Sequence, residues 1–129
     1  MTDKKLIFFD IDGTLYNTSK EVPEDARNAV IQLREQGHIV AIATGRGPFM
    51  FKELREMLGI ETYISYNGQY IVYEGQVIYE NPISNETLDA LTKQAYKNDH
   101  PIAYCDENDL RVSTREHKHV QSGIGSLKL

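Results

Sequence analysis

The sequence predicts an α/β fold with a Rossmann-like, three-layer core around a parallel sheet, followed by the beginning of a smaller α+β unit. Two short runs, residues 6–9 and 39–43, are wholly apolar. Strands covered on both faces are continuously apolar, whereas half-exposed strands alternate, so both runs are typical of a parallel sheet. A helix-like segment, residues 23–36, separates them. This order predicts a βαβ unit with a right-handed crossover.

The segment 23–36 carries the signals of a complete helix. Pro23 suits the first turn, and Glu24 and Asp25 favour the positive end of the helix dipole. Gly37 can close the helix. Its apolar residues fall at helical spacing and form one stripe, made of Ala26, Ala29, Val30 and Leu33.

The middle of the chain predicts a second helix and a third strand. The helix covers residues 48–58, has apolar residues at helical spacing and ends at Gly59. The short strand covers residues 63–65, and Asn67-Gly68 marks a turn after it. The core therefore continues its alternation of strands and helices up to this turn.

The pattern then changes to that of a smaller unit. Two runs rich in tyrosine, isoleucine and valine, residues 70–73 and 76–79, flank Glu74-Gly75 and predict a hairpin. After Asn81-Pro82, a third helix is expected from Ser84 to about residue 97. Its inward positions are expected to be Leu88, Leu91 and Ala95.

Two further strands are predicted over residues 101–105 and 110–114, and residues 115–129 show no convincing periodicity. We therefore predict a core of residues 1–82 and a second, incomplete unit of residues 83–129.

Composition excludes several classes of function. The formal net charge is −5 and no basic stripe occurs, so nucleic acid is not an expected partner. No apolar run is long enough to cross a membrane, and the first residues lack the apolar core of a signal peptide. The single cysteine, Cys105, cannot form an internal disulfide. These features predict a cytoplasmic protein without a membrane partner.

Two carboxylates follow the first apolar run at once. Asp10 and Asp12 stand one residue apart, and Gly13 comes next. Alternate side chains of a strand share a side, so the two like charges repel each other unless a cation lies between them or one is protonated. Gly13 permits a turn with positive φ and lets a ligand approach the backbone.

Polar groups also follow the second apolar run, namely Thr44, Gly45 and Arg46. Ligands of open parallel sheets bind beyond the carboxyl ends of the strands, so these groups are expected to meet the carboxylates if the two strands are neighbours. Carboxylates favour a hard cation, above all Mg²⁺, whereas hydroxyl and N–H donors suit a phosphate.

This combination predicts phosphoryl transfer. Asp10 would attack phosphorus and form an aspartyl phosphate, and Asp12 would move the protons. Thr44, with the N–H groups near Gly13 and Gly45, would hold the transferring group. Mg²⁺ between the carboxylates and the phosphate would relieve the charge conflict.

Simpler interpretations remain open for each of these residues. Asp10 and Asp12 could form a polar turn or a receiver-like phosphoacceptor, although Gly-Thr directly after the pair argues against the latter. Thr44-Gly45-Arg46 could be an ordinary loop before a helix. Asn67 could lie near the substrate or only make its turn, and Arg46 and Asn67 are the weaker candidates for substrate contact.

The segment Asp10-Ile11-Asp12-Gly13-Thr14-Leu15 resembles the first motif of the haloacid dehalogenase (HAD) superfamily of phosphohydrolases. Thr44-Gly45-Arg46 resembles its second motif. Ala-Thr-Gly-Arg followed by Ser65-Tyr66-Asn67-Gly68 is similar to the Cof-type branch (cap class IIB), sugar-phosphate phosphatases with a large cap inserted after the third core strand. The resemblance covers residues 5 to about 114.

The resemblance implies a role for each matching residue. Asp10 would be the nucleophile, Asp12 the acid/base and Thr44 a phosphate ligand. Asp10 and the backbone carbonyl of Asp12 would bind Mg²⁺. Residues 83–129 would begin the cap, which selects the substrate in this branch.

The resemblance also implies parts that this sequence does not show. Members of the branch complete the cap and return to the core with a lysine and a G-D-x-x-N-D-type motif, and no such motif follows Thr44 here. We therefore expect a truncated core that lacks two strands and exposes the flank of its first strand.

The expected function is a Mg²⁺-dependent phosphatase acting on a small, sugar-phosphate-like metabolite. One alternative is a catalytically incomplete fragment or split-protein half, which pairs through the open sheet edge as a homodimer or with a complementing chain. A phosphomutase is a further alternative.

Overall fold

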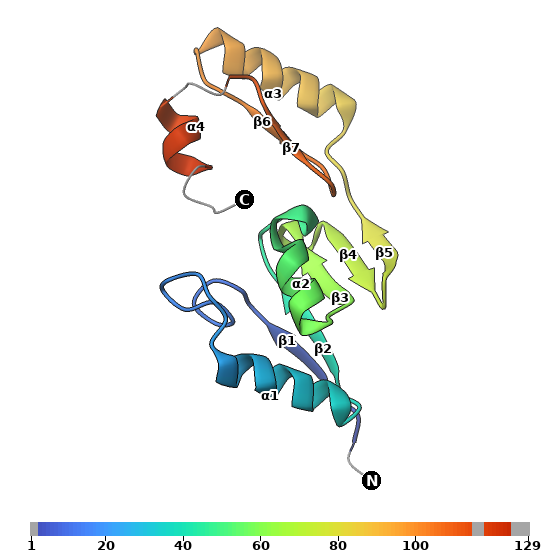
Figure 1. The fold of residues 1–129 in the computed structure, drawn as a ribbon. Coiled ribbons are helices and arrows are strands. Elements are labelled where there is room, and N and C mark those ends of the chain that lie inside the picture. Colours follow the sequence, from blue (N-terminus) through green and yellow to red (C-terminus); the bar gives the residue numbers. More distant parts are fainter. Residues whose placement is uncertain (1–2, 115–117, 125–129) are drawn as a thin grey trace. The chain divides into compact units, whose positions relative to one another are not determined.

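The computed structural model describes residues 3–114 and 118–124 (Figure 1). The chain divides into two compact units, Met1–Asn81 and Pro82–Leu129, each with its own sheet. The division falls beside Pro82. The interpretation of the two units as core and cap stays a prediction.

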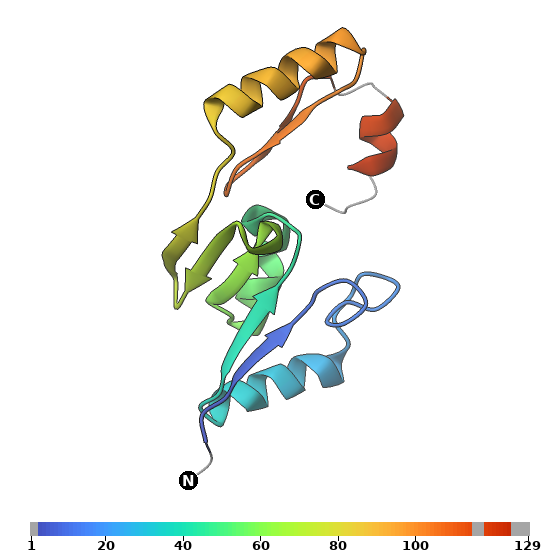
Figure 2. The same ribbon diagram turned by 180° about the vertical axis from the view of Figure 1, so that it is seen from behind.

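The first unit contains a five-stranded sheet whose strands follow chain order. Strands β1 (Leu6–Phe9), β2 (Ile39–Ala43) and β3 (Thr62–Ser65) are parallel, and β4 (Tyr70–Tyr73) and β5 (Gln76–Glu80) continue the sheet as antiparallel strands (Figure 2). The predicted α/β fold is confirmed. The sheet is mixed because the short turns after β3 and β4 can only return the chain antiparallel.

Helices connect the parallel strands. Helix α1 (Glu24–Glu35) joins β1 to β2, and α2 (Lys52–Leu58) joins β2 to β3. The predicted second helix begins with a 3₁₀ turn, η1 (Pro48–Phe51), and ends at Gly59 in the left-handed conformation (φ 64°). Glycine adopts this conformation without the steric cost of a Cβ, which explains the sharp helix end.

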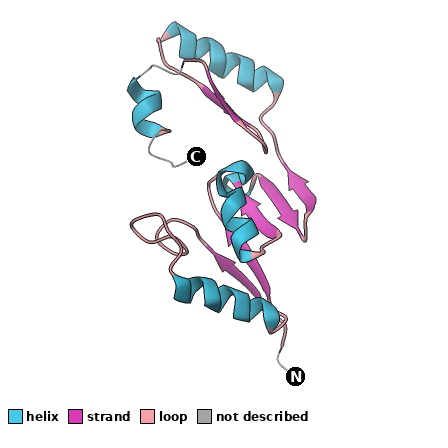
Figure 3. Cartoon of the chain, in the orientation of Figure 1, coloured by secondary structure: helices cyan, strands magenta, loops and turns pink. Residues whose placement is uncertain are grey.

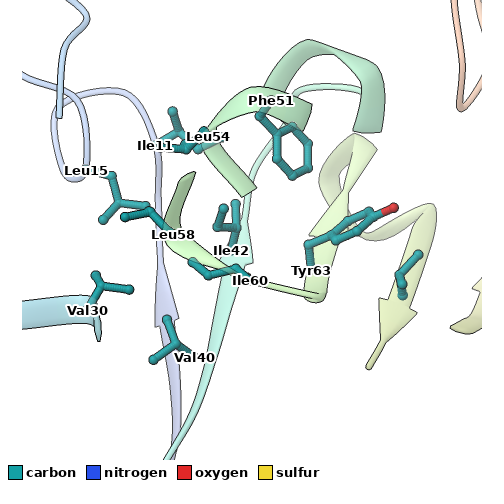
Figure 4. Packing of buried hydrophobic residues seen from close by; sticks show 11 residues of the cluster. Ile11, Leu15, Val30, Val40, Ile42, Phe51, Leu54, Leu58, Ile60 and Tyr63 are labelled. Carbon is teal, nitrogen blue, oxygen red and sulfur yellow. The ribbon is translucent and has the colours of Figure 1, made fainter. Parts of the chain in front are cut away.

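One apolar cluster holds this unit together (Figure 4). Val30 of α1 and Leu54 and Leu58 of α2 are buried against Val40 and Ile42 of β2. Since both helices contribute to the same cluster, both cover the same face of the sheet. Burial of such side chains stabilises the unit by roughly 1.5–3 kcal/mol each relative to exposure.

Strand β1 lies at the edge of the sheet, as the sequence predicts for its flank. Among the described residues of this unit, no helix covers the face opposite α1 and α2 (Figure 3). Leu6 and Phe8 are about half exposed. Strand β5, at the other edge, is exposed along its whole length.

The second unit consists of helix α3 (Asn85–Lys97), a hairpin of β6 (Ala103–Cys105) and β7 (Leu110–Val112), and helix α4 (Lys118–Gly123). Ser84 caps α3 by accepting a hydrogen bond from the Thr87 N–H at 3.2 Å. Helix α4 falls in a stretch for which the sequence predicts no periodic element.

The prediction that Leu91 faces inward is wrong. Leu91 is 50% exposed. Thr92 lies on the inner face instead, and its hydroxyl is 2.7 Å from that of Tyr104 in β6. The reason is that positions spaced by four and then three residues, Leu88, Thr92 and Ala95, face one way on a helix of 3.6 residues per turn.

No helix among the described residues is long and apolar enough to span a membrane. A cytoplasmic location stays a prediction.

Candidate active site

The candidate residues lie at the carboxyl edge of the parallel strands. Asp10 directly follows β1 and Thr44 directly follows β2. The two strands are hydrogen-bonded neighbours in parallel register, with Phe9 opposite Ile42, so both end at the same edge of the sheet. The sequence predicted that these residues meet if the two strands are neighbours, and in the structure the strands are neighbours.

Buried side chains anchor the loop that carries the two carboxylates. Ile11 and Leu15 are almost fully buried in the apolar cluster, whereas Asp10 and Asp12 are exposed. Two backbone bonds close the turn, from the Leu15 N–H to the Asp10 carbonyl at 3.3 Å and from the Tyr16 N–H to the Ile11 carbonyl at 2.9 Å. The apolar anchors therefore hold the loop while the carboxylates between and beside them reach solvent.

Gly13 adopts a positive φ of 79° within this loop. A Cβ at this position would meet no atom within 4 Å. The requirement for glycine is therefore the backbone conformation, and the space around it stays open.

Asp12 forms a bidentate ion pair with Arg46. Arg46 Nε donates to Oδ2 at 3.0 Å and Nη2 donates to Oδ1 at 2.8 Å. The Arg46 guanidinium also lies near the Tyr16 ring, with Cζ 5.9 Å from the ring centroid. A positive charge therefore lies beside one of the two carboxylates, which reduces the predicted charge conflict. The sequence predicted that Arg46 would lie near the carboxylates and named it as a weak candidate for substrate contact, but it did not predict this ion pair.

Asp10 has different surroundings. Its Oδ1 accepts a hydrogen bond from the Ile11 N–H at 2.8 Å. No hydrogen bond from the described residues reaches its other oxygen, Oδ2. One carboxylate oxygen is therefore available at the edge of the sheet.

Thr44 is buried at the end of β2, and its hydroxyl is already used as an acceptor. The Arg46 N–H donates to Thr44 Oγ1 at 3.1 Å, and the Thr44 N–H donates to the Ile64 carbonyl of β3 at 2.9 Å. A hydroxyl that accepts one hydrogen bond keeps its own proton for another acceptor.

Gly45 and Asn67 lie in contact. A Cβ on Gly45 would lie 3.0 Å from Asn67 Oδ1. The Asn67 N–H donates to the Thr44 carbonyl at 3.2 Å, and Asn67 has a left-handed backbone (φ 54°). The structure thus places Asn67 against the Thr44–Gly45 loop, and it also makes the predicted turn with Gly68.

Two residues beside the site were not singled out from the sequence. Tyr66 precedes Asn67, also has a positive φ of 48°, and donates its N–H to the Arg46 carbonyl at 3.1 Å. Gly47 lies against the hydroxyl end of the Tyr66 side chain, where a Cβ would clash with the tyrosine oxygen. The two glycines that flank Arg46, Gly45 and Gly47, were the sequence feature from which this close packing could have been predicted.

Within residues 3–114 and 118–124, no three His, Cys, Asp or Glu side chains gather closely enough to hold a metal ion. A surface hollow of about 240 Å³ lies elsewhere, at the amino ends of β2 and β3. Its lining includes Arg34, His38 and Glu61, and none of the candidate residues. The hollow is therefore not part of this site.

Comparisons with known proteins identify the family and the fold. A family model described as haloacid dehalogenase-like hydrolase matches residues 7–124. "Putative phosphatase YkrA" of Bacillus subtilis (strain 168) is 50% identical over 126 residues, which are 98% of this chain and 49% of that protein.

Two solved structures show the same fold. A hypothetical protein from Geobacillus kaustophilus HTA426 superposes with a TM-score of 0.92 at 46% identity, over 98% of this chain and 50% of the other. The HAD subclass IIB sugar phosphatase BT4131 superposes with a TM-score of 0.73 at 28% identity, over 97% of this chain and 49% of the other. The chain spans about half the length of these relatives.

Proposed function

The chain belongs to the haloacid dehalogenase-like hydrolase family, and from this premise we propose that it carries the nucleophilic part of a Mg²⁺-dependent phosphatase site. The observation that supports the proposal most strongly is the meeting of Asp10 and Thr44 at the ends of two adjacent parallel strands. A nucleophilic carboxylate and a phosphate-binding hydroxyl need this proximity, because in-line attack requires the transferring group to be held beside the attacking oxygen.

Asp10 is the proposed nucleophile. Its free oxygen, Oδ2, attacks phosphorus, a bond forms between this oxygen and phosphorus, and the bond from phosphorus to the leaving oxygen breaks. Asp12 enters this step protonated and donates its proton to that leaving oxygen. Asp12, now ionised, then takes a proton from a water whose oxygen bonds to phosphorus as the bond between phosphorus and Asp10 breaks, which releases phosphate and returns Asp10 to the carboxylate and Asp12 to the acid.

Thr44 and nearby backbone N–H groups are the proposed phosphate contacts. Because Thr44 Oγ1 accepts from the Arg46 N–H, its own proton can be donated to a phosphate oxygen. The N–H groups near Gly13 and Gly45 would add donors at the same edge. Hydrogen bonds to a charged phosphate are stronger than those between neutral groups.

The donor set fits Mg²⁺. This ion prefers oxygen ligands and usually takes only one or two carboxylates from a protein, with water completing its shell. Asp10 through its carboxylate and Asp12 through its backbone carbonyl are the residues that would hold it. When bound, Mg²⁺ would neutralise phosphate charge and polarise the phosphorus–oxygen bonds.

A small, sugar-phosphate-like metabolite is the proposed substrate class. The support comes from the structural likeness to BT4131, a subclass IIB sugar phosphatase, over almost the whole chain. Release of phosphate from a panel of sugar phosphates, compared with nucleotides and phosphoserine, would test this class. A preference for a non-sugar monoester would contradict it.

The test of the reaction is phosphate release from p-nitrophenyl phosphate with Mg²⁺, for the native chain and for Asp10→Asn. The substitution keeps the shape but removes the nucleophile, so we expect the rate to fall by roughly a hundredfold or more. Asp3→Asn, an exposed acid outside the site, is the matched control and should keep the native rate. Equal rates for native chain and Asp10→Asn would refute the nucleophile assignment.

A second candidate role is complementation by another chain. Strand β1 is an open edge with half-exposed Leu6 and Phe8, and unpaired strand edges accept further strands. A homodimer or a complementing chain could cover this edge, and a complementing chain of different sequence could also supply the lysine and distal acids that the resemblance implies. Light scattering after size exclusion should then show a defined complex that Phe8→Lys weakens. A monomeric native chain at all concentrations would argue against self-pairing.

A further inference from the structure

The two carboxylates of the site differ in what they are bonded to. Both oxygens of Asp12 accept hydrogen bonds from Arg46, at 3.0 and 2.8 Å. Asp10 accepts one, from a backbone N–H, and keeps Oδ2 free of bonds from the described residues. A cation that approached both side chains would therefore find one of them already occupied.

Arg46 is the more firmly held partner of the ion pair. Its side chain is 10% exposed, whereas that of Asp12 is 55% exposed. The Tyr16 ring lies beside the guanidinium. Because Asp12 is exposed in a turn next to Gly13, the pair orients the carboxylate more than it orients the arginine.

The backbone of Arg46 is fixed from the neighbouring strand. Its N–H is bonded to Thr44 Oγ1, and its carbonyl accepts the Tyr66 N–H at 3.1 Å. Tyr66 and Asn67 both have a left-handed backbone, which is uncommon for residues other than glycine. Gly47 lets the Tyr66 ring pack directly on the loop. The loop after β3 therefore holds the residue that in turn holds Asp12.

We propose that Arg46 is a positioning residue that divides the work between the two carboxylates. The inference rests on the proposed function and deepens it. The guanidinium fork keeps the ionised Asp12 side chain oriented to accept a proton and away from the cation, and it leaves Asp10 as the side-chain ligand and nucleophile. The planar fork matters because its two parallel N–H donors match the two carboxylate oxygens in a fixed geometry, whereas the lysine ammonium is a compact point charge.

The substitution Arg46→Lys removes the planar guanidinium and keeps the positive charge, so it tests the two properties separately. Lysine keeps one positive charge but lacks the rigid pair of parallel donors, so the Asp12 carboxylate gains freedom to turn toward a bound cation. We therefore expect Arg46→Lys to tighten the binding of Mn²⁺, used as a paramagnetic substitute for Mg²⁺, by about three- to tenfold. The gain should require the Asp12 carboxylate.

The experiment is a double-mutant cycle of Mn²⁺ affinity, measured on the chain by electron paramagnetic resonance of the free ion. It compares the native chain, Arg46→Lys, Asp12→Asn and the double variant. Arg46→Lys should tighten binding in the native background and not in the Asp12→Asn background. Arg27→Lys, on the exposed side of α1, is the matched control and should leave the affinity unchanged.

The contact itself has a separate readout. In nuclear magnetic resonance spectra, the Arg46 Nε–H proton should be shifted and protected from exchange in the native chain, and both properties should be lost in Asp12→Asn. The dispersion of the backbone amide signals shows whether each variant remains folded. These signals report on the ion pair without any turnover.

Three results would overturn the division of roles. They are equal effects of Arg46→Lys in both backgrounds, an Arg46 Nε–H signal that Asp12→Asn leaves unchanged, and absence of Mn²⁺ binding by the native chain. Failure of the proposed function looks different. In that case Asp10→Asn would bind Mn²⁺ as tightly as the native chain, whatever Arg46 does.

Discussion

The side chain of Ile11 should contribute strongly to stability although it lies between the two acidic residues of the site. Ile11 is 0% exposed and belongs to the apolar cluster with Leu15 and Leu54. Ile11→Ala removes three carbon atoms, each worth about 0.8 kcal/mol when buried. With the cavity that remains, we expect a loss of about 3–4 kcal/mol in the free energy of unfolding.

The assay is urea unfolding followed by circular dichroism, because the chain contains no tryptophan. Ile11→Val should cost about 1 kcal/mol and complete a graded series. Ile83→Ala is the matched control, since Ile83 is 60% exposed, and should change the stability by less than about 0.5 kcal/mol. A loss below about 1 kcal/mol for Ile11→Ala would refute the view that buried Ile11 anchors the carboxylate loop.

The other predictions concern a helix end and a hairpin turn. Gly59→Ala should destabilise the chain by about 1–2 kcal/mol in thermal melts, because φ is +64° and the new Cβ would lie 2.3 Å from Arg34 Nη1. Gly75→Ala has a similar φ but no atom within 4 Å, so an equal loss there would contradict the steric part of the reasoning. Hydrogen bonds from the Asn108 and Asp109 N–H groups lower the pKa of Asp106 below its ordinary value. A lowered pKa means that the Asp106 carboxylate stabilises the turn above the unfolded pKa, and that this stabilisation is lost as the pH falls through the folded pKa. The protection of these two amides, taken as their exchange rate relative to the intrinsic rate at the same pH, should therefore fall below about pH 4. Unchanged protection down to pH 2 would contradict it.

The sequence predicted the elements of the core and the residues at their ends. The apolar runs at β1 and β2 are local signals, because burial on both faces leaves no polar position within a strand. Asp10 and Thr44 stand directly after these runs, so their place at one sheet edge followed once the strands were taken as parallel neighbours. The helix of residues 23–36 could also be predicted, since the residues that mark each of its ends lie within a few positions of that end.

Contacts between distant residues were not readable in the same way. Arg46 and Asp12 are 34 positions apart, and their ion pair depends on where the loop after β2 folds back. Tyr66 and Gly47 likewise meet only because β3 lies beside β2. On α3 the sequence favoured Leu91 over Thr92 for the inner face, because leucine is the more hydrophobic residue. Thr92 lies there instead, and its hydroxyl partner, Tyr104, comes near only in the folded chain.

The sequence by itself thus determined that two carboxylates and a threonine follow two apolar strands, because strand periodicity and apolar burial are properties of consecutive residues. The tertiary structure decided how the carboxylates differ. Asp12 is held by Arg46, and Asp10 keeps one oxygen free of bonds from the described residues. The physical reason is that an ion pair depends on distances across the fold, which loop packing around Gly47 and Tyr66 sets and no local pattern encodes.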